Sequence, residues 1–402
     1  MVFHNFHILN SNKIKKKYIY TRGGTQLMKM TISKKGLYEG LETAAKAISP
    51  NSPVPALSGI KIEAEENALI LTGSDADVSI RYVLTNEENE DLKLNVIETG
   101  AVVVDYRYLL EIVRKIESEE IQIEILDGTL TRFSGGSAEF KINGFRAESY
   151  PEIDFSKPGN TFTIGSGVLS EIIEETAFAA NSKDTRLVLT GVNFNSDGTK
   201  IICTATDSYR LARKIVPVES EPFKITVLAK SLNMARSIFG SKEADVEISL
   251  NDKKILFSSS GIIMQTRLLE GTFPETDRLI PAEFSRELVV NRRMLISAID
   301  RTSFIKTDNM FIIRMQISGN EILLTTKSQE IGESHEDLIA ESYTGDPIDI
   351  SFTGNYVSDA AKALNTDNIR IRFTGDMKPF ILVNDGNDDS VLQLVLPVRT
   401  YN

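Results

Sequence analysis

The sequence predicts an α+β protein made of three tandem copies of one domain, each with two helices packed on antiparallel sheets. An internal repeat is the first reason: a short β run ends in a branched residue, and apolar residues follow five and nine positions later. This offset describes a strand that turns into a helix whose apolar face lies on the sheet. The pattern occurs three times, at Ile32, Leu37 and Leu41, at Ile164, Leu169 and Ile173, and at Val290, Leu295 and Ile299.

The spacing of the copies is the second reason. Ile32, Ile164 and Val290 are 132 and 126 residues apart, which is the length of a domain and too long for a solenoid repeat. Matching Pro-Glu linkers occur at 149–153 and 272–275. The predicted domains are therefore 28–152, 153–276 and 277–402.

Each domain is expected to use a β-α-β-β-β unit twice, with its helices on one side of the sheets. Helices are predicted at Lys34–Ile48, Asp105–Glu117, Val168–Asn181, Lys230–Phe239, Arg292–Phe304 and Asn355–Leu364. Strands of the first domain are predicted at 29–33, 60–62, 69–72, 78–84, 101–104, 121–126, 129–133 and 139–142. The clearest later strands are predicted at 187–195, 200–206, 209–216 and 391–397. Such a tandem leaves open sheet edges at both ends, so we expect head-to-tail pairing with another copy.

Composition excludes several classes of function. The 402 residues are 41% hydrophobic and 25% charged, an ordinary globular balance. The single cysteine, Cys203, lies in a β-like run, so we expect a buried structural thiol and no intrachain disulfide or thiolate metal site. Only His335 of the three histidines lies outside the N-terminal segment, which argues against histidine-based catalysis or metal binding. No catalytic residue, metal or cofactor is predicted.

Residues 1–27 differ from the rest of the chain. They carry five basic residues and no acid, a charge of +5, whereas the remainder carries −16. They lack the apolar core of a secretory signal, and no run approaches the roughly 18 apolar residues that span a bilayer. We interpret Met28 as the true start and 1–27 as an extension that is not native or is disordered; a basic tail that binds nucleic acid is the alternative. The acidic body indicates a cytoplasmic protein that by net charge alone repels DNA.

An enzyme is the first competing hypothesis, with Asp207 and Arg210 as a catalytic pair or Asp75 and Asp77 as metal ligands. The sequence has no Gly-rich phosphate loop, no nucleophile motif and no cluster with metal-ligand spacing. Asp75 and Asp207 occupy equivalent repeat positions, and Ser328 lies near the same place in the third domain. We therefore favour a turn-capping role.

Three separated motifs resemble those of a known family: ATDSYRLA at 205–212, Phe273-Pro274, and LVLPVR at 394–399. Together with the triplication, they make residues 28–402 similar to the bacterial sliding clamps, the beta subunits of DNA polymerase III. The resemblance implies a head-to-tail homodimer, a ring of six domains around duplex DNA with helices lining the hole. It also implies a non-catalytic processivity factor for DNA replication that tethers the polymerase.

The resemblance places a cleft for partner peptides between the second and third domains. Expected partners are the replicative polymerase's alpha-type subunit, the clamp loader and other proteins with clamp-binding motifs. A leucine-rich floor with a polar rim suits such peptides, Tyr356 is expected to gate the pocket, and Ser208 and Tyr209 replace the glycine and histidine of the best-known pattern. The implied residues, called here the partner-peptide residues, are Leu189, Thr206, Ser208, Tyr209, Arg210, Leu211, Pro274, Arg278, Leu279, Tyr356, Pro379, Leu394, Leu396, Pro397 and Val398. From the residues alone, the leucines at 189, 211, 394 and 396 also fit ordinary sheet core.

Basic residues on the polar helix faces and nearby loops are the candidates for DNA contact, without sequence preference. They are Lys34, Lys35, Lys46, Arg107, Arg114, Lys115, Lys183, Arg186, Lys230, Arg236, Arg292, Arg293 and Lys362. Solvated surface charge is the alternative, and Glu171, Glu174 and Glu175 share one of these helices. The loop at 51–53 lacks the arginine that the family pattern supplies to DNA.

The resemblance also implies dimer contacts at Phe140 and Ile142, on an edge strand, and at Phe304 and Ile305, at a helix end. A strand edge with four apolar side chains suits a β-paired interface with a small core, although each residue singly fits domain core. A second competing function is a protein-interaction scaffold of tandem α+β domains that does not bind DNA.

Overall fold

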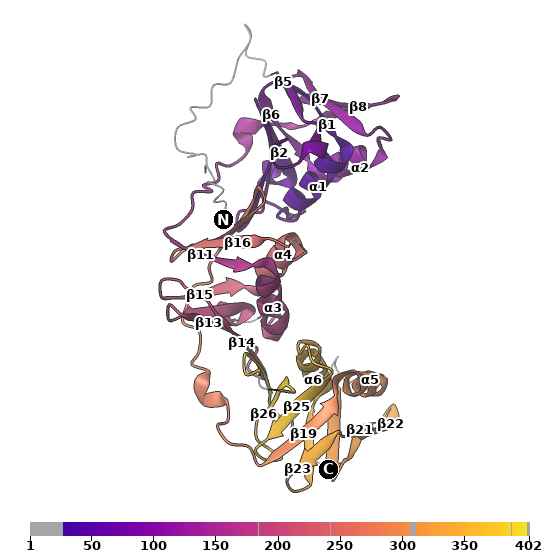
Figure 1. Cartoon of the computed structure of the whole chain (residues 1–402). Coiled ribbons are helices and arrows are strands. Elements are labelled where there is room, and N and C mark those ends of the chain that lie inside the picture. The colour runs from indigo at the N-terminus through magenta and orange to yellow at the C-terminus, as the bar shows by residue number, and fades with distance from the viewer. Residues whose placement is uncertain (1–26, 184, 242, 306–310, 387, 400–402) are drawn as a thin grey trace. The chain divides into compact units, whose positions relative to one another are not determined.

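The computed structural model describes residues 27–399 apart from 184, 242, 306–310 and 387, so the predicted extension lies almost wholly outside the described residues. The described chain divides into two compact units (Figure 1). The first unit holds 27–155 with 260–264, and the second holds the remainder, including the third predicted domain. Each unit is described by itself below.

Six α-helices are present in the described residues, two in each predicted domain. Their bounds are α1 (Lys34–Ala45), α2 (Tyr106–Lys115), α3 (Ser166–Thr176), α4 (Ala229–Phe239), α5 (Arg292–Thr302) and α6 (Gly354–Lys362). Each begins at the residue after a strand ends, as the repeat predicts. Side chains cap three of these turns: Ser33 accepts from the Gly36 N–H, Asp105 from Arg107 and Asn291 from Met294.

The first unit contains two sheets with α1 and α2 packed against each other and against the sheets. One sheet has the strand order β5-β1-β7-β8-β9, and the other contains β10-β6-β2-β3-β4. The bounds are β1 (Lys29–Ser33), β2 (Gly59–Glu65), β3 (Ala68–Ser74), β4 (Val78–Leu84), β5 (Asn95–Glu98), β6 (Gly100–Asp105), β7 (Glu120–Asp127), β8 (Leu130–Gly135), β9 (Ala138–Asn143) and β10 (Phe145–Arg146). Leu37, Leu41 and Leu109 are fully buried in the core between these layers.

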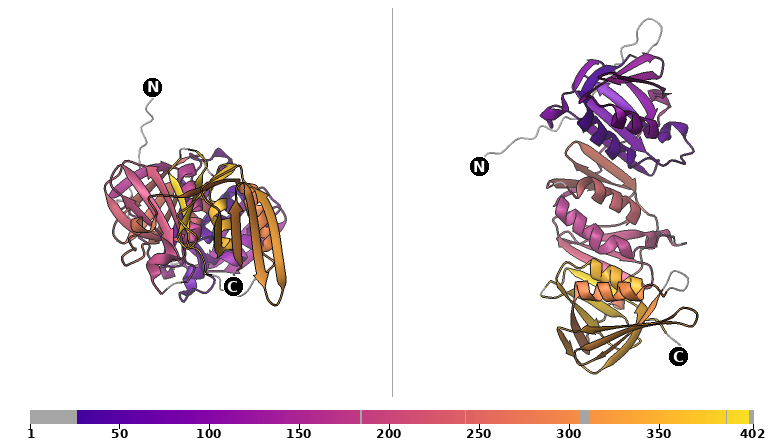
Figure 2. Two further views of the ribbon diagram at one scale, coloured as in Figure 1. Left: turned by 90° about the horizontal axis from the view of Figure 1, so that it is seen from below. Right: turned by 90° about the vertical axis from the view of Figure 1, so that its right-hand side faces the viewer.

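The second unit contains the two later domains, and its four α-helices lie on one face (Figure 2). Its second-domain strands are β11 (Asn160–Gly165), β12 (Gly191–Ser196), β13 (Lys200–Thr206), β14 (Arg210–Pro217), β15 (Phe223–Leu228), β16 (Asp245–Leu250), β17 (Lys254–Ser259) and the second half of β18 (Ile262–Arg267), whose first half belongs to the first unit. Its third-domain strands are β19 (Arg286–Asn291), β20 (Ile312–Ser318), β21 (Glu321–Ser328), β22 (Gly332–Ile339), β23 (Ser342–Thr344), β24 (Ile348–Thr353), β25 (Asn368–Phe373), β26 (Phe380–Asn384) and β27 (Val391–Val395).

One sheet joins the second and third domains. Its order is β15-β12-β13-β14-β27-β26-β25-β19-β23, and the junction is the antiparallel pair β14 and β27. Leu211 lies opposite Leu394 there, and both belong to a small buried cluster with Ile381 and Val383. The C-terminal strand therefore fixes the two domains to each other through backbone hydrogen bonds and a shared apolar cluster.

The α+β prediction with paired helices and antiparallel sheets is confirmed, and two details are corrected. Residues Leu187–Thr190, predicted as strand, form a 3₁₀ turn before β12 begins at Gly191. Several helices end earlier than predicted; α1 ends at Ala45 and α3 at Thr176. The apolar spacing continues past these ends because the chain turns on with hydrogen bonds three residues apart, as from Ala180 N–H to the Ala177 carbonyl.

Cys203 is fully buried in β13, as predicted. Burial raises the pKa of its thiol well above the usual range. The neutral thiol is therefore a small apolar side chain of the core.

Candidate functional site

The turn between β13 and β14 places the centre of the predicted site. The Asp207 Oδ1 accepts hydrogen bonds from the N–H groups of Tyr209 and Arg210, at 2.9 and 3.0 Å. Thr206 completes the turn, since its hydroxyl accepts from the Ser208 N–H and donates to the Arg210 carbonyl. Asp207 is therefore a turn-capping residue, as predicted.

The first domain repeats this turn in detail. The Asp75 Oδ1 accepts from the N–H groups of Asp77 and Val78, at 3.0 and 2.7 Å, and Ser74 takes the place of Thr206. In the third domain, Ser328 accepts from the N–H groups two and three residues later. The carboxylates proposed as metal ligands or catalytic groups are thus structural, and the turn is a feature of the repeat.

Ser208 adopts a backbone conformation that favours glycine. Its φ is 78°, and the equivalent Ala76 in the first domain has φ 81°. A side chain in this left-handed region costs about 1 kcal/mol relative to the right-handed one. The glycine of the family pattern suits this position, so the serine carries strain that the sequence alone did not reveal.

Replacing Ser208 with glycine is expected to stabilise the second domain by at most about 0.5 kcal/mol, because the extra chain entropy of glycine offsets part of the relieved left-handed strain. Urea unfolding measures this effect. Ser182→Gly, in an exposed loop, is the control and is expected not to stabilise. A Ser208→Gly protein that unfolds at lower urea than the parent would contradict the strain.

Arg210 connects the turn to both domains. Its guanidinium donates to Asp207 (3.0 Å), to Asp359 of α6 (2.7 Å) and to the Phe178 carbonyl (2.8 Å). Its charged carbon lies 4.7 Å from the ring centre of Tyr356 and 5.3 Å from that of Phe178. Arg210 is thus held between second-domain and third-domain groups, with a side chain only 13% exposed.

Two tyrosines lie together beside Arg210. The rings of Tyr209 and Tyr356 are stacked, with centres 6.5 Å apart and planes at 21°. Tyr209 is 62% exposed, whereas Tyr356 is half-buried. Burial raises the pKa of Tyr356, and the Asp207 carboxylate adds to the rise. Tyr356 therefore stays neutral at physiological pH, and the two rings together offer a flat apolar surface with polar tips.

The structure separates the predicted leucines by burial. Leu189, Leu211 and Leu394 are at most 2% exposed, so in this chain they are core, as the alternative interpretation held. Leu396 is half-buried, and its N–H donates to the Tyr209 carbonyl at 2.9 Å. Leu279 is 53% exposed. The exposed apolar surface among these residues is thus supplied by Tyr209, Leu279 and Leu396, whereas the other three leucines are buried.

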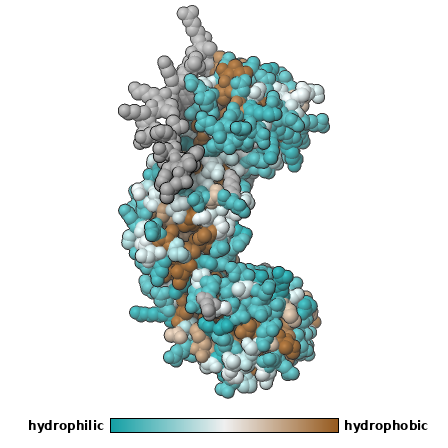
Figure 3. All heavy atoms as spheres, viewed as in Figure 1, coloured by the Kyte–Doolittle hydropathy of each residue, from teal (hydrophilic) through white to brown (hydrophobic). Residues whose placement is uncertain are grey.

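The remaining partner-peptide residues lie in turns and chain segments that bonds within the fold hold in place. Asp277 precedes Arg278 and Leu279 in a short 3₁₀ turn, and Arg213 of β14 holds that turn by a 2.6 Å ion pair with Asp277. The Val398 N–H donates to the Ser351 carbonyl, which fixes the chain after β27. Residues at the rim are exposed or half-buried: Ser208, Pro274, Arg278, Pro379, Pro397 and Val398. Figure 3 shows apolar surface on the second domain that extends toward the third.

Many of the basic candidates for DNA contact already have partners in the fold. Lys34 donates to the Arg114 and Ile116 carbonyls, and Arg292 to the Leu364 carbonyl at 2.6 Å, so these two neutralise helix ends. The other bonded candidates are Arg107 with Asp105, Arg114 and Lys115 with Glu111, Arg236 with Glu174, and Arg186 with Ser208. The candidates that are exposed and make no ion pair to another described residue are Lys35, Lys183, Lys230, Arg293 and Lys362; Lys46, at the end of α1, is also exposed.

A cavity of about 590 Å³ lies on the helix face where the second and third domains meet. It is lined by α3, α4 and α6, and two basic candidates, Arg236 and Lys362, are among its residues. Carboxylates of Glu171, Glu174 and Asp359 share the lining. The mixed charge does not favour the binding of a phosphate in this cavity.

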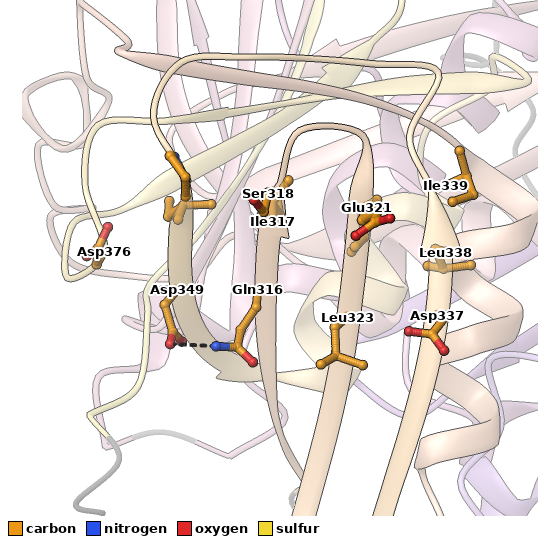
Figure 4. Close-up of a pocket in the computed structure, with 13 residues that line it drawn as sticks. Gln316, Ile317, Ser318, Glu321, Leu323, Asp337, Leu338, Ile339, Asp349 and Asp376 are labelled. Atoms are coloured by element: carbon orange, nitrogen blue, oxygen red, sulfur yellow. Dashed lines mark hydrogen bonds between the residues drawn. The ribbon is translucent and has the colours of Figure 1, made fainter.

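A second cavity, of about 660 Å³, lies over the four-stranded sheet β22-β21-β20-β24 (Figure 4). Its carboxylates include Glu321, Asp337, Asp349 and Asp376, and the Gln316 amide donates to Asp349. An Arg314 guanidinium bound to the same carboxylate holds the pKa of Asp349 below its usual range. None of the predicted site residues lines this cavity, so the sequence analysis did not anticipate it.

The predicted dimer residues differ in what they offer to a partner. Phe140 and Ile142 of β9 are half-buried and pack on the first-domain core. Phe304 is 62% exposed just after α5, whereas Ile305 is 2% exposed and belongs to the interior. Ile305 is thus buried in the single chain, and a dimer contact at this residue stays a prediction. The sequence analysis missed β22, an edge strand that Arg301 of α5 joins through an ion pair with Glu336.

Two findings concern other kinds of site. Within the described residues, the helices lack the length and the apolar character that crossing a bilayer takes. Those same residues hold no group of three or more His, Cys, Asp or Glu side chains arranged for a metal ion.

Three tandem α+β domains, a sheet shared across a domain junction and non-catalytic turns together define the class of processivity clamps. Three family models match in order: the DNA polymerase III beta subunit N-terminal domain at 28–154, its central domain at 163–275 and its C-terminal domain at 277–399. The chain belongs to the DNA polymerase III beta subunit family, the bacterial beta sliding clamps.

Individual relatives agree along their full length. A beta sliding clamp of Bacillus subtilis is 35% identical over 379 residues, 93% of this chain and 100% of that protein. The crystal structure of a Bacillus subtilis sliding clamp has TM-score 0.89 and 34% identity, over the same shares of the two chains. The clamp of Bartonella birtlesii, solved bound to griselimycin, has TM-score 0.87 and 26% identity, covering 93% of this chain and 100% of that one.

The chain is therefore a sliding clamp that acts in DNA replication as a non-catalytic accessory subunit of DNA polymerase III. Its partners as a member of this family are DNA, a polymerase and other clamp-binding proteins. The competing scaffold and enzyme hypotheses are set aside.

Proposed function

We propose that partner peptides bind the surface over the β14–β27 junction, between the second and third domains. The pairing of these two strands carries the proposal, because it brings Tyr209, Tyr356 and Leu396 to one place from distant parts of the chain. Exposed apolar groups beside buried leucines suit the apolar anchors of a short peptide. The polar rim, with Ser208 and Arg278, then orients the peptide backbone. Expected peptides are those of the replicative polymerase's alpha-type subunit, the clamp loader and other clamp-binding proteins.

Griselimycin tests the peptide site, since a related clamp is known to hold it. The parent protein is expected to bind griselimycin, and Leu279→Asp to weaken binding about tenfold or more, because an exposed apolar anchor is replaced by a charge. Isothermal titration calorimetry measures both affinities. Ile97→Asp is the matched control, since Ile97 is 55% exposed in the first unit. Equal losses in both variants, or none in Leu279→Asp, would place the site elsewhere.

We propose that the ring is closed by two edge strands, β9 of one copy and β22 of the other. Both strands lie at the ends of their sheets and leave one side of the backbone unpaired. β22 is acidic, with Glu333, Glu336 and Asp337, whereas β9 has no net charge because Lys141 pairs with Glu139 at 3.0 Å, so no strong repulsion opposes the pairing of these edges. Phe304, next to the end of α5, supplies an exposed apolar group beside this edge. The resulting assembly is a head-to-tail dimer with six domains.

We propose that duplex DNA passes through this ring and meets the helix faces. Phosphate contacts of lysine and arginine carry no sequence information, so the clamp can slide. The exposed basic residues at 35, 183, 230, 293 and 362 are the best candidates for such contacts, since the others are bound within the fold. A closed ring retains DNA by topology, so few contacts suffice. The net-acidic body of the chain suits a cytoplasmic protein.

A further inference from the structure

Asp359 is bound to the central residue of the proposed peptide site, although neither the repeat nor the family motifs point to it. Its Oδ2 accepts from the Arg210 Nη1 at 2.7 Å. The two residues come from different domains, and Asp359 is 38% exposed, on the helix-side cavity. The bond thus connects the partner surface with the helix face of the same unit.

The guanidinium of Arg210 has a defined orientation because its donors point in three directions. Nε donates a hydrogen bond to Asp207 in its own turn, Nη2 donates to the Phe178 carbonyl, and Nη1 donates to Asp359. A guanidinium is planar, so three separate acceptors fix both its position and the tilt of its plane. Of the three acceptors, only Asp359 belongs to the third domain.

Asp359 and Tyr356 are three residues apart on α6 and therefore share one side of that helix. Tyr356 places its ring 4.7 Å from the Arg210 charge and stacks on Tyr209. The ion pair and the aromatic stack consequently hold the same helix against the same arginine. Without the ion pair, the Tyr209–Tyr356 stack and the contact of the Tyr356 ring with Arg210 remain between α6 and the turn.

We infer that Asp359 is a positioning residue for the partner-peptide site: by anchoring Arg210 across the domain junction it sets the Tyr209–Tyr356 pair that a partner meets. The inference rests on the proposed peptide site. Asp359 touches no partner itself and acts through Arg210. Its side chain is 38% exposed and lines the helix-side cavity.

Asp359→Asn tests the inference with two readouts, griselimycin affinity by calorimetry and tyrosine ring signals by NMR of protein labelled with ¹³C-tyrosine. The variant is expected to bind griselimycin about five- to tenfold more weakly, the range of a modest coupling between sites. The signals of Tyr209 and Tyr356, assigned through Tyr356→Phe, are expected to move toward those of unstacked rings. Asp359→Glu retains the charge and is expected to keep most of the griselimycin affinity and most of the parent's tyrosine signals. Asp300→Asn, an exposed helical aspartate of the same domain, is the control.

Unchanged affinity and unchanged tyrosine signals in Asp359→Asn would overturn the inference. Weaker binding with unmoved signals and a matching drop in thermal stability would also overturn it, since the residue would then be merely structural. If the parent itself does not bind griselimycin, the proposed site fails for this ligand. The tyrosine signals still decide the inference in that case, because stacking is measured without a ligand. Arg210→Lys keeps the positive charge but lacks the planar guanidinium that binds three acceptors. It is therefore expected to move the signals of Tyr209 and Tyr356 as well.

Discussion

Replacing Lys214 with methionine is expected to destabilise the second unit by about 3–5 kcal/mol, the cost of leaving a buried charge without its partner. Lys214 of β14 is 5% exposed, and its ammonium lies 2.8 Å from the carboxylate of Glu175 on α3, which is 3% exposed. Urea unfolding of parent and variant measures the loss. The effect is large because methionine retains the volume of the lysine but leaves the buried Glu175 carboxylate without the ammonium that lies 2.8 Å away.

This ion pair lies at the junction of the second and third domains. Gln393 of β27, 1% exposed, donates from its amide to the Glu175 carbonyl at 2.8 Å. Burial alone would lower the pKa of Lys214, but the hydrogen bond and charge of Glu175 outweigh it and the pKa is raised. Burial raises the pKa of Glu175, and Lys214 offsets part of that rise. The pair thus joins α3 to the sheet directly behind the β14–β27 pairing.

The loss in Lys214→Met is expected to depend on pH. A carboxyl whose pKa is raised in the folded state binds more protons there than when unfolded, so it favours folding as the pH falls. The variant should therefore lose less stability at pH 5 than at pH 8. Lys214→Met with Glu175→Leu removes both charges and should recover most of the loss. Lys200→Met, exposed on β13, is the control and should change stability by less than about 0.5 kcal/mol. A pH-independent loss, or no loss, would show that the charges are not coupled.

Replacing Phe304 with serine is expected to weaken dimerisation about thirtyfold or more, the effect of removing an apolar anchor from a small interface. Folding should be preserved, because Phe304 is 62% exposed in the single chain. Ile305 is not a suitable variant, since its burial would confuse loss of folding with loss of dimer. Sedimentation equilibrium over a range of protein concentrations measures the change.

Met294→Ser is the matched control for this experiment. Met294 is 52% exposed on α5, the same helix that precedes Phe304, but it lies at the other end. Its variant should dimerise like the parent. If Phe304→Ser also keeps the parent's dissociation constant, Phe304 is not a contact of the dimer. The proposed pairing of β9 and β22 would then be contradicted, and another interface would have to hold the dimer together.

The repeat was readable from the sequence because each β-to-α turn has the same construction. A helix starts at the residue after a strand, so the offset from the strand's last branched residue to the helix's apolar face is fixed, as from Ile164 to Leu169. The turn-capping role of Asp75 and Asp207 followed from their equivalent places in the repeat. Turns and turn caps of this kind involve only residues that are close in the sequence, so they can be predicted from the sequence alone.

Features that depend on distant residues were not predictable in the same way. Leu187 and Leu189 have the composition of a strand but form a 3₁₀ turn, and Leu189 is buried with Phe273 and Val188 in a separate cluster. The bond from Arg210 to Asp359 joins residues 149 positions apart. The edge position of β22 depends on the strand order of the whole sheet. The family resemblance supplied most of the partner-peptide residues; it gave no information on which of them are exposed.

Retention on circular DNA tests the central claim most directly, namely that the chain holds DNA by encircling it. The clamp is loaded by the clamp loader onto a nicked circular plasmid and onto the same plasmid cut once, and the protein that stays with the DNA is measured by gel filtration in high salt. A topological ring predicts that clamp stays on the circle at salt that abolishes ionic contacts, and that it is lost from the linear form. Equal loss from both forms would contradict a ring and would leave simple ionic binding.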